Sequence, residues 1–157
     1  MNTKSDEATG ARRMYPPVWF GLAILLMFLL DRFAPGPRWL EGPLRIAGAL
    51  PFLFGLGLGI GGSAIFQRAG TTIKPFQESS KLVTNGPFRY ARNPMYLGMA
   101  LGLAGIGIFL GTLTPLLLIP AYVWKITMGF IQHEEVMLES VFGDAYREYM
   151  GRVRRWI

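Results

Sequence analysis

The hydrophobic positions of this chain gather into four long apolar stretches with polar segments between them. A helix that crosses a bilayer needs about 17–25 mostly apolar residues, and the stretches 18–34, 44–66, 95–110 and 115–131 are close to this length. Only residues 111–114 join the last two, so a tight antiparallel helical pair is expected there. The pattern therefore predicts an all-α integral membrane protein with about four transmembrane helices.

A different pattern follows the fourth stretch. Apolar residues recur in pairs every four positions from Met137 to Met150, with charged residues between them, which predicts one amphipathic helix over 134–152. Such a helix either lies along the membrane surface or caps the helix bundle from the cytoplasm. Residues 1–13 are polar and lack periodicity, so we expect a disordered arm ahead of a single domain over 14–157.

Composition narrows the function classes. The chain is 51% hydrophobic and 17% charged, with a mean hydropathy of +0.31, whereas soluble domains carry about 25% charged residues. With no cysteine and one histidine, a disulfide, a cysteine nucleophile, a zinc finger and haem attachment are excluded, and no metal site is expected. The net charge is +6, and the basic residues responsible lie next to the apolar stretches. This position favours membrane lipid headgroups over nucleic acid as their partner.

The basic residues also predict an orientation. Three of them, Arg32, Arg38 and Arg45, lie in the first connection or at the ends of the apolar stretches that it joins, and none lies between the last two stretches. Most others lie in the two ends of the chain and the 67–94 connection: Lys4, Arg12, Arg13, Arg68, Lys74, Lys81, Arg89, Arg92, Arg147, Arg152, Arg154 and Arg155. By the positive-inside rule, both ends are cytoplasmic, in an expected bacterial or archaeal plasma membrane. Lys125, inside the fourth stretch, is expected to reach the interface or a polar cavity.

Residues 55–62 (GLGLGIGG) superficially match the glycine-rich loop of a dinucleotide-binding fold. That loop requires a preceding strand, a following helix and an acidic residue about 20 positions on, and this run lies inside an apolar stretch. Glycines four residues apart let transmembrane helices approach closely. We therefore expect the glycines of this run to be packing residues, as well as Gly98, Gly102 and Gly105 on the third stretch; those of the run are Gly55, Gly57, Gly59, Gly61 and Gly62.

Two segments hold the candidate chemistry. Residues 67–96 combine aromatic and basic side chains at a density that a surface loop does not need and a pocket wall does. Glu134 and Glu135 follow the fourth stretch, where two carboxylates are costly unless they are solvated or matched by a cation. One interpretation pairs them with water, Arg89 or Arg92; the other uses a carboxylate to receive the ammonium or ribose of a ligand.

Three motifs in order resemble the signature of the membrane methyltransferases that include isoprenylcysteine carboxyl methyltransferase and the phospholipid N-methyltransferases. Residues 82–98 (LVTNGPFRYARNPMYLG) resemble L-V-x-x-G-x-Y-x-x-x-R-H-P-x-Y-x-G, the Glu134–Glu135 pair follows across a helical pair, and residues 142–149 resemble F-G-x-x-Y-x-x-Y. The likeness covers roughly residues 70–155. It implies methyl transfer from S-adenosyl-L-methionine, bound at the cytoplasmic mouth of the bundle, to a lipophilic acceptor.

The resemblance also implies roles for residues. Glu134 binds polar groups of the cofactor with Glu135 in support, and Phe88 replaces the aromatic Tyr of the motif. Arg92 orients these elements, and the implied catalytic residues are Arg92, Tyr96 and Glu135, although the residues do not identify a base. The remaining implied cofactor-binding residues are Lys81, Leu82 and Val83, through backbone groups, and Asn93, Pro94, Met95 and Tyr96 around the adenosine and methionine parts.

Two positions depart from the isoprenylcysteine enzymes. Asn93 stands in place of His, which is closer to the phospholipid N-methyltransferases, and Phe130 stands in place of the Arg that contacts the substrate carboxylate. A phospholipid amine, an isoprenoid or fatty thiol, and a small lipophilic metabolite therefore all stay open as acceptors. Arg154 and Arg155 are read as a membrane-surface anchor or a headgroup contact, and the oligomeric state is not readable.

The alternative functions are a small four-helix transporter and a non-enzymatic membrane scaffold. A proton-coupled transporter needs a carboxylate within a span, and the only candidate is Asp31 at the very end of the first stretch.

Overall fold

The computed structural model describes residues 15–70 and 81–157. In these ranges the chain forms helices joined by short turns, with one isolated β-bridge between Arg38 and Thr112. The arm expected over residues 1–13 and the 71–80 part of the candidate segment lie outside the described residues.

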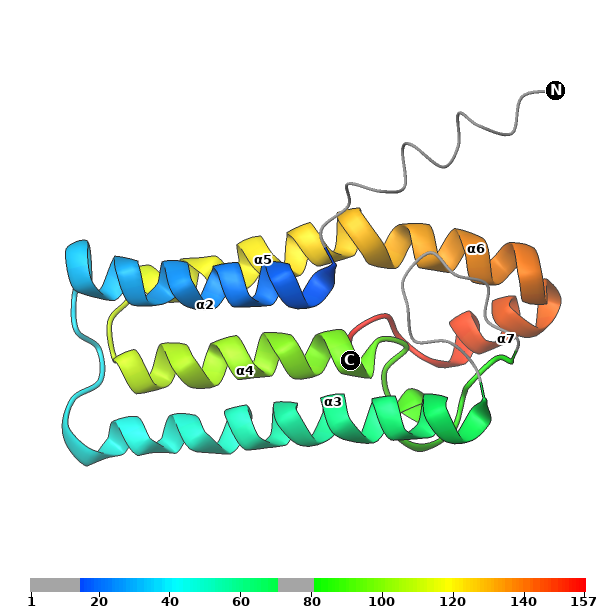
Figure 1. The fold of residues 1–157 in the computed structure, drawn as a ribbon, viewed down its shortest axis with the longest axis horizontal. Coiled ribbons are helices and arrows are strands. Elements are labelled where there is room, and N and C mark those ends of the chain that lie inside the picture. Colours follow the sequence, from blue (N-terminus) through cyan, green and yellow to red (C-terminus); the bar gives the residue numbers. More distant parts are fainter. Residues whose placement is uncertain (1–14, 71–80) are drawn as a thin grey trace, which may run out of the picture.

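The elements follow one another in a simple up-and-down order (Figure 1). The first half contains α2 (Pro16–Phe33), the 3₁₀ helix η1 (Gly42–Gly48) that leads into α3 (Ala49–Ala69), and the short η2 (Gly86–Arg89). The second half contains α4 (Pro94–Leu110), η3 (Thr114–Leu117), α5 (Leu118–Ile126), a π-helical turn η4 (Thr127–Ile131), α6 (Gln132–Phe142) and α7 (Asp144–Arg152).

Local sequence explains where the central helices begin and end. Proline occupies the first turn of α2 and of α4, where its missing N–H costs no helical hydrogen bond. Gly70 and Gly111 end α3 and α4 with φ values of +68° and +75°, a left-handed conformation that glycine adopts without a steric penalty. These stop signals fix the length of α4 at 17 residues.

The chain is an all-α membrane protein, as the apolar pattern predicts. Three helical stretches, Pro16–Phe33, Gly42–Ala69 and Thr114–Phe142, are long and apolar enough to cross a membrane. The shorter apolar helix α4 is at the centre of the bundle and packs against α2, α3 and α5 (Figure 1). Lys125 on α5 places its Nζ 4.5 Å from the ring centre of Trp19, so this cation is held over an aromatic face.

The seam between α3 and α4 consists of glycines, but not with the expected spacing. A Cβ atom added at Gly48 or Gly55 would collide with the backbone oxygen of Gly105 or Gly98, respectively. At Gly62 it would meet the side chain of Met95, 2.8 Å away. The glycines that pack here, Gly48 at the end of η1 and Gly55 and Gly62 on α3, thus recur every seven residues. A Cβ at Gly57, Gly59 or Gly61 meets nothing within 4 Å, so these three glycines are not needed for packing as predicted, although the Gly59 nitrogen lies 3.2 Å from a Cβ placed at Gly98.

The helix predicted over 134–152 is two helices. Backbone dihedrals stay helical from α5 through η4 into α6, so the fourth apolar helix continues to Phe142. At Gly143 the φ value is +54°, and the chain turns into α7. The apolar period in the sequence continues across this break because the turn brings the apolar sides of α6 and α7 into one cluster.

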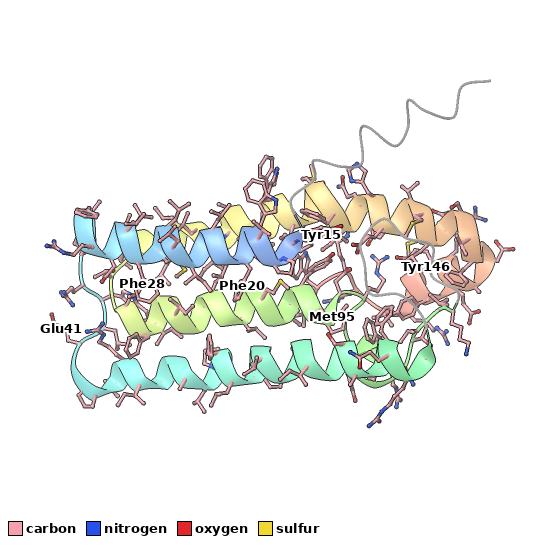
Figure 2. All side chains as sticks on the ribbon, viewed as in Figure 1. Tyr15, Phe20, Phe28, Glu41, Met95 and Tyr146 are labelled. Carbon is pink, nitrogen blue, oxygen red and sulfur yellow. The ribbon has the colours of Figure 1, made fainter. Side chains whose placement is uncertain are left out.

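That cluster caps the bundle and does not leave α7 lying free along a surface. Tyr146, Tyr149 and Val153 are buried and pack with Leu82, Leu138, Phe142 and Met150. Figure 2 shows Tyr146 at the end of the molecule where α6 and α7 meet. Of the two placements expected for this amphipathic region, along the membrane surface or as a cap on the bundle, the structure has it as a cap.

Asp31 has a structural partner at the end of the bundle opposite to the cap. The hydroxyl of the fully buried Thr112 donates a 2.7 Å hydrogen bond to Asp31 Oδ1, which ties α2 to the turn after α4. Asp31 is thus a structural acceptor at a helix end and does not lie in the middle of a span.

Candidate functional site

A small polar cavity lies between the bundle and its cap. Eight of the residues expected from the sequence line it: Lys81, Leu82, Val83, Phe88, Arg92, Asn93, Glu134 and Glu135. They come from the 81–93 segment and from α6, which are separated by the whole α4–α5 pair. The fold therefore brings the first two motifs of the resemblance together at one place.

Glu134 carries the most distinctive contact of the site. The hydroxyl of Tyr96, in the first turn of α4, donates a 2.7 Å hydrogen bond to Glu134 Oε1. Tyr96 is buried, and Glu134 is partly buried. Tyr96 does not line the cavity itself, so it acts on the cavity through this carboxylate.

Glu135 is held by two cations. Arg92 Nη1 is 3.2 Å from Glu135 Oε1, and the Arg155 guanidinium donates to both oxygens, at 2.9 Å and 2.6 Å. Side-chain exposure is only 11% for Arg92 and 14% for Glu135, so this network is largely shielded from solvent. The two glutamates thus differ. Glu135 is paired with arginines, as the first interpretation of the pair expects, whereas Glu134 accepts a hydrogen bond from a tyrosine hydroxyl.

Backbone contacts fix the 81–93 segment against the cap. The turn at Asn85–Gly86–Pro87 starts η2, which buries Phe88. Tyr149 Oη donates a 2.6 Å hydrogen bond to the Phe88 oxygen. Asn93 closes the segment because its Nδ2 donates to the Arg155 oxygen at 3.0 Å. These contacts connect positions that lie about sixty residues apart in sequence.

The remaining expected residues lie just outside the cavity. Pro94 is buried at the start of α4, and Met95 faces α3, where Ser63 Oγ is 3.7 Å from its sulfur. Figure 2 shows Met95 at the end of α4 nearest the cap.

Four lining residues were missed from the sequence: Phe66, Leu138, Tyr146 and Tyr149. The two tyrosines belong to the third motif, but helical periodicity alone assigned them to an apolar stripe. Burial raises the pKa of Tyr149 to about 12. Burial also raises the pKa of Tyr146, and the Glu135 carboxylate raises it further, whereas Arg92 lowers it. Both hydroxyls therefore keep their protons near neutral pH; the Tyr149 hydroxyl donates to the Phe88 oxygen, and the Tyr146 hydroxyl lies against the Arg92 guanidinium.

The donor set suits a ligand with both cationic and anionic groups. Glu134 offers a carboxylate within a wall of aromatic rings, and Phe66 and Phe88 meet edge to face at 5.3 Å. Arg92 Nε is buried and finds no hydrogen-bond acceptor among the described residues. A buried donor without a partner costs about 1–3 kcal/mol, which favours an added anionic group. The cavity volume of about 50 Å³ is room for a few water molecules, so its walls would have to separate to admit a ligand of cofactor size.

A second, apolar feature lies next to this cavity. A groove of about 630 Å³ runs along α4 between α2 and α3, with Gly59, Gly98 and Gly102 among its lining residues. Ser63 and Gln67 are its polar side chains and lie toward the cavity end, beside Met95. Met95 and Phe88 both approach Gly62, so the groove and the aromatic wall of the cavity are neighbours.

The chain was compared with known proteins. The phospholipid methyltransferase family model matches residues 44–145. "Protein-S-isoprenylcysteine O-methyltransferase" of Schizosaccharomyces pombe is 38% identical over 72 residues, which are 46% of this chain and 30% of that protein. "Protein-S-isoprenylcysteine O-methyltransferase B" of Arabidopsis thaliana is 32% identical over 77 residues, 49% of this chain and 39% of that protein. The chain thus spans less than half of these curated relatives.

A shorter relative matches over its full length. An "Uncharacterized protein" of Haemophilus influenzae is 40% identical over 63 residues, which are 40% of this chain and 100% of that protein. The family match contains the first two motifs and the start of the third, and it confirms the resemblance predicted from them. On this ground the chain belongs to the phospholipid methyltransferase family.

Proposed function

We propose that this protein transfers a methyl group from S-adenosyl-L-methionine to a lipophilic acceptor at the cytoplasmic face of a membrane. The observation that carries the proposal is the cavity that joins the 81–93 segment, the glutamate pair and the α7 tyrosines. The family match and the curated methyltransferases that it resembles support the reaction class.

The residues present fit this cofactor. Glu134 would accept hydrogen bonds from its ribose hydroxyls or ammonium group, and the open donor of Arg92 would meet its carboxylate. The aromatic wall of Phe66, Phe88 and Tyr146 would hold a sulfonium through cation–π attraction. When bound, the cofactor supplies an already activated methyl group, so the protein has no electrophile to generate.

The work left to this chain is alignment and exclusion of water. Positioning of two reactants is worth about 7–11 kcal/mol of a barrier when the geometry is close to that of attack. Here the Glu134–Tyr96 bond fixes one wall of the cavity and the Glu135 network fixes another. An amine acceptor also has to lose a proton. Water or Glu135 would receive it, or Tyr96 would take it up while its own hydroxyl proton passes to Glu134.

We propose that the acceptor places its apolar chain in the α2–α3–α4 groove. The groove volume of about 630 Å³ is within the range of roughly 300–1,000 Å³ that is usual for ligand sites. Its walls are apolar and open at the depth of the membrane-spanning helices, and its polar end adjoins the cavity. A molecule with a lipid chain and a polar head therefore suits both ends.

The proposed orientation places the cavity on the cytoplasmic side. Lys81 lines the cavity, and Arg68, Arg89 and Arg147 belong to the last turn of α3, to η2 and to α7. Arg38 and Arg45 belong to the connection from α2 to α3, which lies at the opposite end of the bundle from α7 (Figure 1). The positive-inside rule then puts the polar cofactor in reach of the cytoplasm.

The experiment that tests the function is a calorimetric titration in lipid nanodiscs with S-adenosylmethionine and S-adenosylhomocysteine. We expect saturable micromolar binding of both, followed by transfer of radiolabelled methyl groups into a lipid extract. Absence of binding in nanodiscs and in several detergents would refute the proposal.

A separate prediction concerns the groove. Gly59→Leu should fill it and lower kcat/KM for the lipid acceptor at least tenfold while the thermal midpoint and cofactor affinity stay near wild type, because a Cβ at Gly59 meets open space. Gly57→Leu is the matched control, since Gly57 lies on the same helix in open space but does not line the groove. Equal losses in both variants, or no loss at Gly59, would contradict the assignment.

A further inference from the structure

The segment that follows α7 returns across the molecule to the candidate site. Residues 153–157, called the strap below, run from the buried Val153 at the cap to the start of α4 (Figure 1). The Arg154 oxygen accepts a 2.9 Å hydrogen bond from the Arg92 N–H, and the Arg155 oxygen accepts one from Asn93. The strap backbone thus holds two adjacent residues of the site.

The strap side chains reach two further elements. The Arg155 guanidinium makes a two-point contact with Glu135 on α6, at 2.9 Å and 2.6 Å. Trp156 packs against the main core, and its Nε1 donates to Thr127 Oγ1 at 3.3 Å. Thr127 opens the π-helical turn from which α6 continues. Turns of this type occur often at functional sites.

These contacts hold three parts of the site that lie on different elements: the 92–93 backbone, the π-helical turn and α6. The backbone of residues 92–93 positions the Arg92 side chain in the cavity wall. The π-helical turn determines how α6 is rotated, and therefore which way Glu134 and Glu135 face. Among the described residues, Arg92 and Arg155 are the cations that pair with Glu135, and Arg92 also lines the cavity. A two-point arginine–carboxylate pair fixes orientation as well as distance.

We propose that Arg155 and Trp156 are positioning residues of the methyl-donor site: the strap sets the relative placement of Arg92, Glu135 and Glu134. The inference rests on the proposed function for its cofactor and on the contacts above for its geometry. It replaces the expectation that Arg155 is a membrane-surface anchor, because its side chain is paired with Glu135.

The test compares two neighbouring arginines. Arg155→Met should raise the Kd for S-adenosylmethionine about tenfold or more, and the turnover rate at saturating cofactor should fall less than threefold. Arg154→Met, which removes the same charge from an exposed side chain, should leave both within twofold. Arg155→Lys should lie between wild type and Arg155→Met, because lysine restores the charge but not the two-point geometry.

A double-variant cycle separates positioning from general damage. If Arg155 acts through Glu135, then Arg155→Met combined with Glu135→Gln should bind the cofactor no worse than the weaker single variant. Additive losses would overturn the proposal, as would an unchanged Kd in Arg155→Met or an equal loss in Arg154→Met.

An independent readout does not need the cofactor. Hydrogen exchange of the Arg92 amide, which donates to the strap, should become at least tenfold faster in Arg155→Met and in Trp156→Ala. If the wild type fails to bind S-adenosylmethionine, the proposed function fails alone, and exchange still decides whether the strap holds Arg92. Unchanged exchange of the Arg92 amide in both variants would overturn the proposal that the strap holds Arg92.

Discussion

Replacing Glu134 with glutamine is expected to weaken S-adenosylmethionine binding about 100-fold while the protein stays folded. A hydrogen bond to a charged group contributes about 1.5–3 kcal/mol, and each 1.4 kcal/mol is about tenfold in affinity. The glutamine amide oxygen can still accept from Tyr96, which now donates to Glu134 at 2.7 Å. The hydrogen bond between α4 and α6 is thereby preserved, and the loss falls on ligand binding.

The matched control for this experiment is Glu139→Gln. Glu139 lies on the same helix and pairs with the exposed Arg147, away from the cavity, so its replacement should change cofactor affinity less than twofold. Calorimetric titration in nanodiscs measures both variants beside the wild type. Wild-type affinity in Glu134→Gln would show that the cavity is not the cofactor site.

Gly55→Leu is expected to abolish the native fold. A Cβ atom at Gly55 already collides with the Gly98 backbone oxygen and lies 3.1 Å from the Gly102 nitrogen, and the rest of a leucine has no room between α3 and α4. Overpacking inside a well-packed core costs about 1–3 kcal/mol and sometimes more. Here the neighbour is backbone, which cannot rotate away, so the loss should reach the upper end.

The yield of monodisperse protein in detergent and its thermal midpoint measure this effect. Gly57→Leu serves again as the control, because a Cβ there meets nothing within 4 Å. A stable, wild-type-like Gly55→Leu protein would mean that α3 and α4 are not in close backbone contact.

The helices themselves could be predicted because their signals are local. The length of each apolar stretch, proline at helix starts and glycine at helix ends are all visible in the sequence. The four apolar helices of the structure agree with these signals. The division at Gly143 was missed because an amphipathic period survives when two helices fold onto one cluster. The seven-residue glycine spacing was missed because helix rotation decides which of Gly55, Gly57 and Gly59 meets the neighbour, and the run contains all three phases.

The candidate site could be predicted in part for a different reason. Its first two motifs have chemistry that stands out in a membrane protein, so Arg92, Asn93, Glu134 and Glu135 were singled out before any geometry. Tyr146 and Tyr149 also served an apolar stripe, and nothing in that period distinguished a cavity wall from a core. Arg155 was one basic residue among several near the end of the chain, and only the fold shows that it returns to Glu135.

That return has a consequence for the order of biosynthesis. A growing chain that has emerged as far as Phe142 already contains all four apolar helices and both glutamates, yet it lacks Tyr146, Tyr149 and the residues that hold Arg92 and Glu135. Membrane insertion and ligand competence are therefore separate events in time. Released chains that end at Phe142 or continue through residue 157 should both be embedded in the bilayer, and only the longer one should retain S-adenosylmethionine.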